Sequence, residues 1–479
     1  MNSTDNNARS EQQEIDASAK WPVLVFVGSA LAWLIGGGVL QLIASIQLHT
    51  PSFLAGCEWL AHGRVAQAAQ NALVYGWGFN AGFALALWLM ARLSAAALRS
   101  GGWLFVAATF WNVGILLGVL GILAGYSTSY QLLEMPRYVN LLLLGAYLLI
   151  GVWVITTFSV RNTENVYASQ WYLFAAVLAF PLLFLAATRM MSQLPVHGTV
   201  QAVVNAWYVN GVYQLWFAPL ALAAAYYFLP KLTGAPIRNY YLASLGFWWV
   251  LVCSAFLGGA RLVGGPVPAW VATLGTTAGL LLPAGLVVLA VNLLGTLAGR
   301  SAALKDSPAL RFVALGLGAY FVAAVLTILL ALRSVAAITQ FTLVPELRDW
   351  LVLYGTFSTI FFGAAYFFLP RLTGKVFRSS ALVAIHYTAT LVGLLAMMIA
   401  LGWGGWQQGM MLNDAAVAFA DITKALSPWL TLRTLALITL LIGHVAFLLN
   451  FIWAVCPINS PGTPAATLAT PPALRAQKA

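Results

Sequence analysis

The chain has 479 residues, of which 61% are hydrophobic and only 7% are charged, and its mean hydropathy is +0.87. Soluble domains carry about 25% charged residues, so this composition excludes a soluble protein. An excess of Lys and Arg over Asp and Glu gives a formal net charge of +11. In a membrane protein this excess follows from the preference of Lys and Arg for cytoplasmic loops, so we expect no nucleic-acid partner.

Long apolar runs define the expected architecture. A helix that crosses a bilayer needs about 20 mostly apolar residues. The sequence contains twelve such runs and therefore predicts an all-α integral membrane protein. We expect a polar cytoplasmic tail over residues 1–20, a twelve-helix membrane domain over 21–455, and a disordered Pro-, Ala- and Thr-rich cytoplasmic tail over 456–479. The predicted spans are 21–47, 71–97, 103–126, 138–160, 169–190, 203–229, 240–263, 269–298, 309–333, 350–369, 380–402 and 429–455.

Two nearly identical segments end the sixth and tenth predicted spans. They read AAYYFLPKLTG (224–234) and AAYFFLPRLTG (364–374). Each has a proline that cannot continue a helix, a cation suited to the negative helix end, and a glycine that opens the turn. Matching helix ends at this interval predict a fold that repeats a unit of several helices.

The placement of Lys and Arg predicts the orientation of the spans. If the N-terminus is cytoplasmic, most of the 23 basic residues lie on the cytoplasmic side, and only eight lie outside. Excess Lys and Arg in short loops marks the cytoplasmic side, so both termini are expected there. The eight outer residues are Arg64, Arg137, Arg189, Arg261, Arg333, Arg348, Lys424 and Arg433.

Several stretches carry a family resemblance, among them GRVAQAAQNALVYGWGFN (63–80), AWYVNGVYQLWFAPLALAAAYYFLPK (206–231), DSPALRFVALGLGAYF (306–321) and WQQGMM (406–411). With them the chain resembles subunit I of haem–copper oxidases, most closely the catalytic subunit of cbb3-type cytochrome c oxidase. The resemblance implies three pseudo-equivalent arcs of four helices in the bacterial cytoplasmic membrane. It also implies membrane lipid as surroundings, and a c-type cytochrome or another respiratory membrane subunit as partner.

The family binds two haems and one copper ion through six histidines, whereas this chain has five histidines in all. By the resemblance, the haem-ligand positions fall on Ala69, Arg348 and Trp350. The copper-ligand positions fall on Asn210, Ala260 and Arg261, and the active-site tyrosine and glutamate positions fall on Ser254 and Leu326. None of the six replacements is a usual haem or copper ligand, so we expect no cofactor, no bound metal and no catalytic residue.

Three functions stay open at this point. The chain is either a non-catalytic scaffold or partner subunit of a respiratory assembly, an active oxidase with unusual haem ligands, or a transporter that uses the emptied haem cavity. Arg261 and Arg348 either pair with Glu346, Asp349 or lipid phosphate, or form an anion site. Because large cavities are costly, we also expect bulky side chains, lipid tails or helix shifts to fill the space, with Trp350 as the candidate plug.

Overall fold

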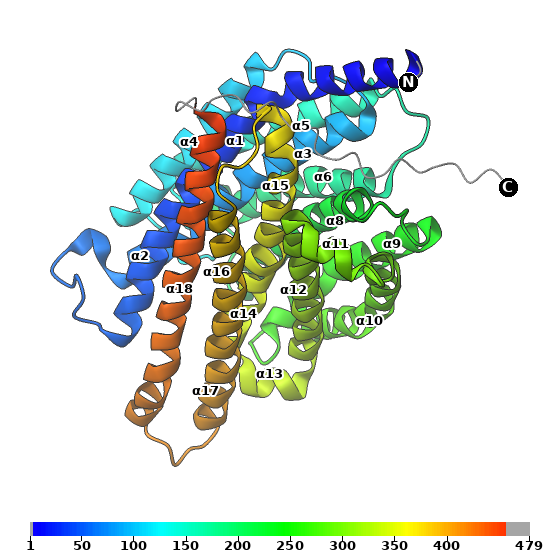
Figure 1. Cartoon of the computed structure of the whole chain (residues 1–479). Coiled ribbons are helices and arrows are strands. Elements are labelled where there is room, and N and C mark those ends of the chain that lie inside the picture. Colours follow the sequence, from blue (N-terminus) through cyan, green and yellow to red (C-terminus); the bar gives the residue numbers. More distant parts are fainter. Residues whose placement is uncertain (1–2, 457–479) are drawn as a thin grey trace.

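The computed structural model describes residues 3–456, and within this range all regular secondary structure is helical (Figure 1). Twelve helices are long and apolar enough to cross a membrane, which confirms the predicted number. They are Glu11–His49, His62–Ser94, Gly102–Leu123, Arg137–Ser159, Ala168–Gln193, Thr199–Thr233, Tyr240–Leu262, Ala269–Leu297, Pro308–Ala331, Val344–Thr373, Ser380–Leu412 and Phe419–Val455. The chain is therefore a multi-pass membrane protein.

Several spans combine α-helix with a short 3-10 or π-helical segment, here labelled η. In chain order the elements are α1 (Ser3–His49), η1 (Glu58–Leu60), α2 (His62–Asn71), η2 (Ala72–Phe79), α3 (Asn80–Ser94), α4 (Gly102–Leu123), α5 (Arg137–Ser159), α6 (Ala168–Thr188), η3 (Arg189–Gln193), α7 (Thr199–Gly211), η4 (Val212–Phe217), α8 (Ala218–Thr233), α9 (Tyr240–Phe256), η5 (Leu257–Leu262), α10 (Ala269–Leu297), α11 (Ser301–Asp306), α12 (Pro308–Ala331), α13 (Arg333–Thr339), α14 (Val344–Trp350), η6 (Leu351–Ser358), α15 (Thr359–Thr373), α16 (Ser380–Met398), η7 (Ile399–Trp403), α17 (Gly404–Leu412) and α18 (Phe419–Val455).

Three spans form the interior: the second (α2–η2–α3), the sixth (α7–η4–α8) and the tenth (α14–η6–α15). In their most apolar stretches 94%, 89% and 94% of the residues are buried, against 39–50% in the other nine spans. These three spans also have the lowest hydropathy of the twelve, and they carry buried polar side chains such as Asn71, Asn210 and Ser358. The three inner spans, four positions apart in chain order, agree with the predicted arcs of four helices.

The two repeated segments form the same helix end. Gly234 and Gly374 adopt left-handed conformations with φ of 68° and 69°. Their backbone N–H groups donate to the carbonyls of Pro230 and Pro370 at 3.0 and 2.9 Å. Glycine adopts this conformation without steric cost and so ends both helices in the same geometry. The predicted repeat is thus confirmed at the ends of α8 and α15.

A π-helical segment interrupts each inner span at mid-length, and the sequence analysis missed this feature. In the tenth span, the hydroxyls of Ser358 and Thr359 donate to the carbonyls five residues earlier, at 2.8 and 3.0 Å. The indole N–H of Trp77 on η2 donates to Ser358 at 2.7 Å and joins the second span to the tenth. Such wide turns re-aim side chains and occur frequently at functional sites.

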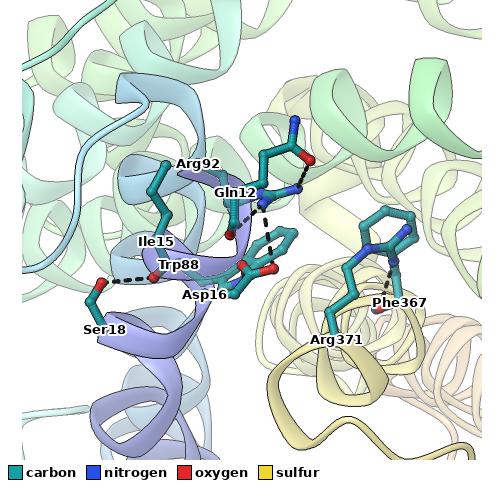
Figure 2. A network of polar contacts seen from close by, with 8 residues as sticks. All are labelled: Gln12, Ile15, Asp16, Ser18, Trp88, Arg92, Phe367 and Arg371. Atoms are coloured by element: carbon teal, nitrogen blue, oxygen red, sulfur yellow. Dashed lines mark hydrogen bonds and ion pairs between the residues drawn. The ribbon is translucent and has the colours of Figure 1, made fainter. Parts of the chain in front are cut away.

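The polar N-terminal stretch continues into the first span, because residues 3–49 form one continuous helix, α1. Asp16 pairs with Arg92 of α3 at 3.4 Å and accepts a hydrogen bond from the Trp88 indole N–H at 3.2 Å (Figure 2). Arg92 also donates to the Gln12 carbonyl at 3.3 Å. These contacts fix the polar turns against the bundle. The predicted C-terminal tail lies outside the described residues, except for Cys456.

Candidate functional site

A cavity of about 540 Å³ lies between α1, α2–η2, α14–η6 and α18. Its body is apolar, and its walls include small side chains. Polar and charged groups gather at the beginning of α14. The residues that line it are Leu34, Gly38, Gln41, Ala44, Leu48, His62, Ala66, Gln70, Leu73, Val74, Trp77, Gln131, Tyr213, Arg261, Leu343, Pro345, Glu346, Asp349, Trp350, Leu353, Tyr354, Arg433, Leu437, Leu440, Leu441 and His444. Its volume is typical of a pocket for a small molecule or cofactor.

A buried ion-pair network borders this cavity. The Arg261 guanidinium on η5 donates to both carboxylate oxygens of Asp349, at 2.9 and 2.5 Å. Arg348 Nε donates to Asp349 Oδ1 at 3.1 Å. Arg433 on α18 forms a separate pair with Glu346 at 2.6 Å. The predicted partners of Arg261 and Arg348 are thus confirmed for Asp349, while Glu346 binds a different arginine.

A second cavity, of about 240 Å³, lies beside the first and shares Gln131, Arg261 and Pro345 with it. It brings together Ala260, Arg261 and Arg348, three of the positions that the resemblance assigned to metal ligands. The lining residues are Gln131, Ala202, Asn205, Ala206, Val209, Ala260, Arg261, Leu262, Leu330, Gln340, Pro345 and Arg348. Arg348 and Trp350, both assigned to haem-ligand positions by the resemblance, therefore border different cavities.

The other predicted positions are also mostly buried. Asn210 Nδ2 donates to the Ser254 carbonyl at 2.8 Å, which links α7 to α9. Leu326 is half-buried on α12, one turn before Leu330 of the second cavity. Ala69 is fully buried on α2 but does not line either cavity. The structure thus gathers half of the predicted positions around α14, whereas Asn210 and Ser254 join α7 to α9 and Ala69 is set apart.

Of the three expected ways to fill the space, side chains alone do not fill the first cavity, and filling by lipid tails stays a prediction. Trp350 stacks on Tyr354, with ring centroids 5.0 Å apart, and forms part of the wall. The facing positions on α1 and α2 include Gly38, Ala44 and Ala66. Because these side chains are small, one indole ring cannot close the gap.

Two histidines lie closer together than the sequence indicated. His444 forms a hydrogen bond with Tyr354 at 2.6 Å, and His386 forms one with Tyr366 at 2.9 Å. Both imidazoles pack against the ring of Phe362, at 6.1 and 4.5 Å between centroids. Their separation in sequence gave no sign of this proximity, because it depends on how α16 packs against α18.

Glu134 is a buried acid that the sequence analysis did not single out. It lies in the loop between α4 and α5, and its carboxylate accepts a hydrogen bond from Asn71 at 2.8 Å. Burial raises the pKa of Glu134 to about 7. Gln131 of the same loop lines both cavities. A single acid within the apolar stretch LLEMP (132–136) was the available signal.

Comparison with known proteins decides the family. The family described as "Cytochrome C and Quinol oxidase polypeptide I" matches residues 22–459, nearly the whole membrane domain. The chain belongs to this family. It is 24% identical to "Cbb3-type cytochrome c oxidase subunit CcoN1" of Stutzerimonas stutzeri over 85% of this chain and 89% of that protein. It is 23% identical to a "Cytochrome c oxidase subunit 1 homolog" of Azorhizobium caulinodans over 98% and 88%.

The fold agrees with this assignment. A cryo-EM structure described as a heme-copper terminal oxidase dimer superimposes with a TM-score of 0.76 and 14% sequence identity. The match covers 94% of this chain and 86% of that one. At this identity the match shows the fold alone. The chain is thus a member of the oxidase subunit I family with the corresponding helical architecture.

Family membership corrects one expectation. We expected no cofactor, but the homologues are haem–copper oxidases, so haem and copper are the cofactors that the family implies. The ligand set does not fit these groups. Among residues 3–456 no three His, Cys, Asp or Glu side chains lie close enough together to hold a metal ion. Arginine has no lone pair for a metal, and Ala69 and Ala260 offer no donor atom.

Proposed function

We propose that this oxidase subunit I homologue is a cbb3-type-like membrane subunit that does not itself reduce dioxygen. It serves as a scaffold or partner subunit in a respiratory electron-transfer assembly. The observation that carries this proposal is the Arg261–Asp349–Arg348 network, which stands where the resemblance places a copper ligand and a haem ligand.

The chemistry of the network supports a non-catalytic role. Guanidinium groups stay protonated at any physiological pH, so they repel a metal cation as well as fail to bind it. Both carboxylate oxygens of Asp349 already accept from the arginines. The network therefore favours a stable ion-pair arrangement at this position over a reactive metal centre.

The apolar surface of the outer helices supports a role as a partner subunit. The outer helices expose large apolar side chains, including Trp171, Leu182 and Trp248, which suit contact with lipid or with another membrane subunit. The similar proteins named above are oxidase subunits of bacteria. We therefore place the chain in the bacterial cytoplasmic membrane with a c-type cytochrome or another respiratory subunit as partner. The distribution of Lys and Arg favours cytoplasmic termini.

A mild-detergent purification from the native host tests the proposal. We expect another respiratory membrane subunit to co-purify in a fixed ratio, measured by quantitative mass spectrometry. Dioxygen consumption, measured with a reduced c-type cytochrome as electron donor, should not depend on this chain.

A matched variant separates this chain's chemistry from that of a co-purified oxidase. Asp349→Asn should leave the dioxygen consumption of an equal amount of assembled complex unchanged. A specific loss of turnover in assembled Asp349→Asn complex would overturn the non-catalytic role. Recovery of the wild-type chain alone, in lipid nanodiscs, would overturn the partner role.

A further inference from the structure

We infer that the second cavity binds a small inorganic anion, of the size of chloride or nitrate, between Arg348 and Arg261. The inference goes beyond the scaffold role and does not depend on it. It starts from the charge of the cavity wall. Two guanidinium groups share the single carboxylate of Asp349, so this network carries one positive charge in excess.

Within the described residues no other acid forms an ion pair with Arg261 or Arg348. Glu346 pairs with Arg433, and Glu134 accepts from Asn71. Arg348 is 7% exposed, so water screens its charge weakly. A buried and uncompensated charge costs several kcal/mol in general, and a counter-ion offsets that cost.

Two arginines that line this cavity keep unused hydrogen-bond donors. Arg348 bonds to Asp349 through Nε alone, so within residues 3–456 its two terminal nitrogens have no partner. Arg261 Nε is buried and also lacks a partner among these residues. A guanidinium presents its N–H groups in a planar fork, which suits the oxygens of an oxyanion or a single halide.

The rest of the wall completes a small site. Asn205 and Gln340 line it from α7 and from the turn after α13. Their amide nitrogens donate to the carbonyls of Gln131 and Arg261 at 2.9 and 2.7 Å, and each keeps one further N–H. Val209, Ala260 and Leu330 supply apolar walls, and these lower the local dielectric and strengthen the attraction of the arginines for an anion. A cavity of about 240 Å³ suits a small ion with a few waters better than a lipid with acyl chains.

The test uses the purified full-length chain in detergent, in sodium gluconate buffer at constant ionic strength. Gluconate, the bulkier ion, is replaced stepwise by chloride or by nitrate, and thermal unfolding is followed by tryptophan fluorescence. We expect the melting temperature to rise with anion concentration and to follow a single-site binding curve. Phosphate serves as a third probe, and a larger shift with phosphate than with chloride and nitrate would overturn the assignment of a small anion.

Three variants give the test its specificity. Arg348→Gln removes the excess charge and should weaken the apparent affinity by at least about tenfold. Arg348→Lys keeps the charge and should retain part of the affinity. Arg189→Gln removes an exposed arginine that bonds Gln193, and should leave the binding curve unchanged.

A second measurement covers the possibility that Arg348→Gln fails to fold. Crystals of the wild-type chain grown with bromide should give an anomalous peak within hydrogen-bond distance of the Arg348 terminal nitrogens. Absence of that peak would overturn the proposal. The same conclusion follows if neither chloride nor nitrate gives a saturable shift, or if Arg348→Gln and wild type give the same curve.

Discussion

The two sides of η2 differ in how completely they are packed. On one side Phe79 stacks on Trp216 of η4, with ring centroids 4.7 Å apart and planes 13° apart, and contacts Phe180 at 4.5 Å. On the other side Leu73 and Trp77 border the cavity of about 540 Å³. One helical segment thus faces both a dense aromatic cluster and an open space.

The difference arises from the elements that face η2. Aromatic residues on α4, α5, α6 and η4 meet Phe79, whereas α1 and α2 present small residues such as Gly38 and Ala66 to the cavity. Hydropathy is similar for both kinds of residue, but their volumes differ. An apolar span in a sequence therefore predicts burial, and the space left between spans depends on which side chains meet.

The largest expected effect lies on the packed side. Trp216→Ala should lower the free energy of unfolding by about 3–5 kcal/mol, because a fully buried indole ring leaves a cavity that its neighbours cannot close. Chemical unfolding of the purified chain in detergent measures this change. Trp270→Ala is the control, since that ring is 68% exposed on α10 and should cost much less. Equal losses in both variants would contradict the contrast drawn here.

On the cavity side, the ion-pair network should carry the next largest effect. Asp349→Asn leaves Arg261 and Arg348 without a counter-charge and should destabilise the fold by about 3 kcal/mol. Asp421→Asn is the matched control, because Asp421 forms an exposed pair with Lys424 at 3.6 Å that contributes less than about 1 kcal/mol. If Asp349→Asn unfolded at the wild-type temperature, water would solvate the network, and its ion pairs would contribute little to stability.

The sequence predicted this network only in part. The number of spans and the inner helix ends follow from hydropathy and turn chemistry, whereas the assignment of residues to ligand positions stays a prediction from the family resemblance. That Arg261 meets Asp349, 88 residues further along the chain, depends on how η5 packs against α14. The cavity and the proximity of His386 to His444 also depend on tertiary packing, which no local pattern encodes.

Glu134, in the loop between α4 and α5, makes the free energy of unfolding depend on pH. The pKa of Glu134 is raised in the folded state to about 7, so the native chain holds this proton more tightly than the unfolded chain. Stability is then full below about pH 4.5 and falls as the pH rises toward 7. Glu134→Gln stays neutral and should be more stable than wild type by about 2–3 kcal/mol at pH 8.

Unfolding measured between pH 5 and pH 8 checks this sign. The stability advantage of Glu134→Gln should shrink as the pH falls, because wild-type Glu134 then becomes neutral as well. Glu164→Gln, in the exposed loop before α6, is the control and should show no such trend. An advantage of Glu134→Gln that is constant across this range would indicate a packing effect instead.

The smallest effect is expected at the cavity wall. Trp350 stacks on Tyr354, and it also borders the cavity, so it is less tightly packed than Trp216. Trp350→Ala should therefore cost only about 1–2 kcal/mol, chiefly the aromatic pair and part of the buried area. This loss is well below that of Trp216→Ala, although both variants remove an indole ring from an inner span. Chemical unfolding of the two variants side by side compares them directly. If Trp350→Ala lost as much as Trp216→Ala, the ring would be packed on both faces, and the cavity would be closed in the protein in solution.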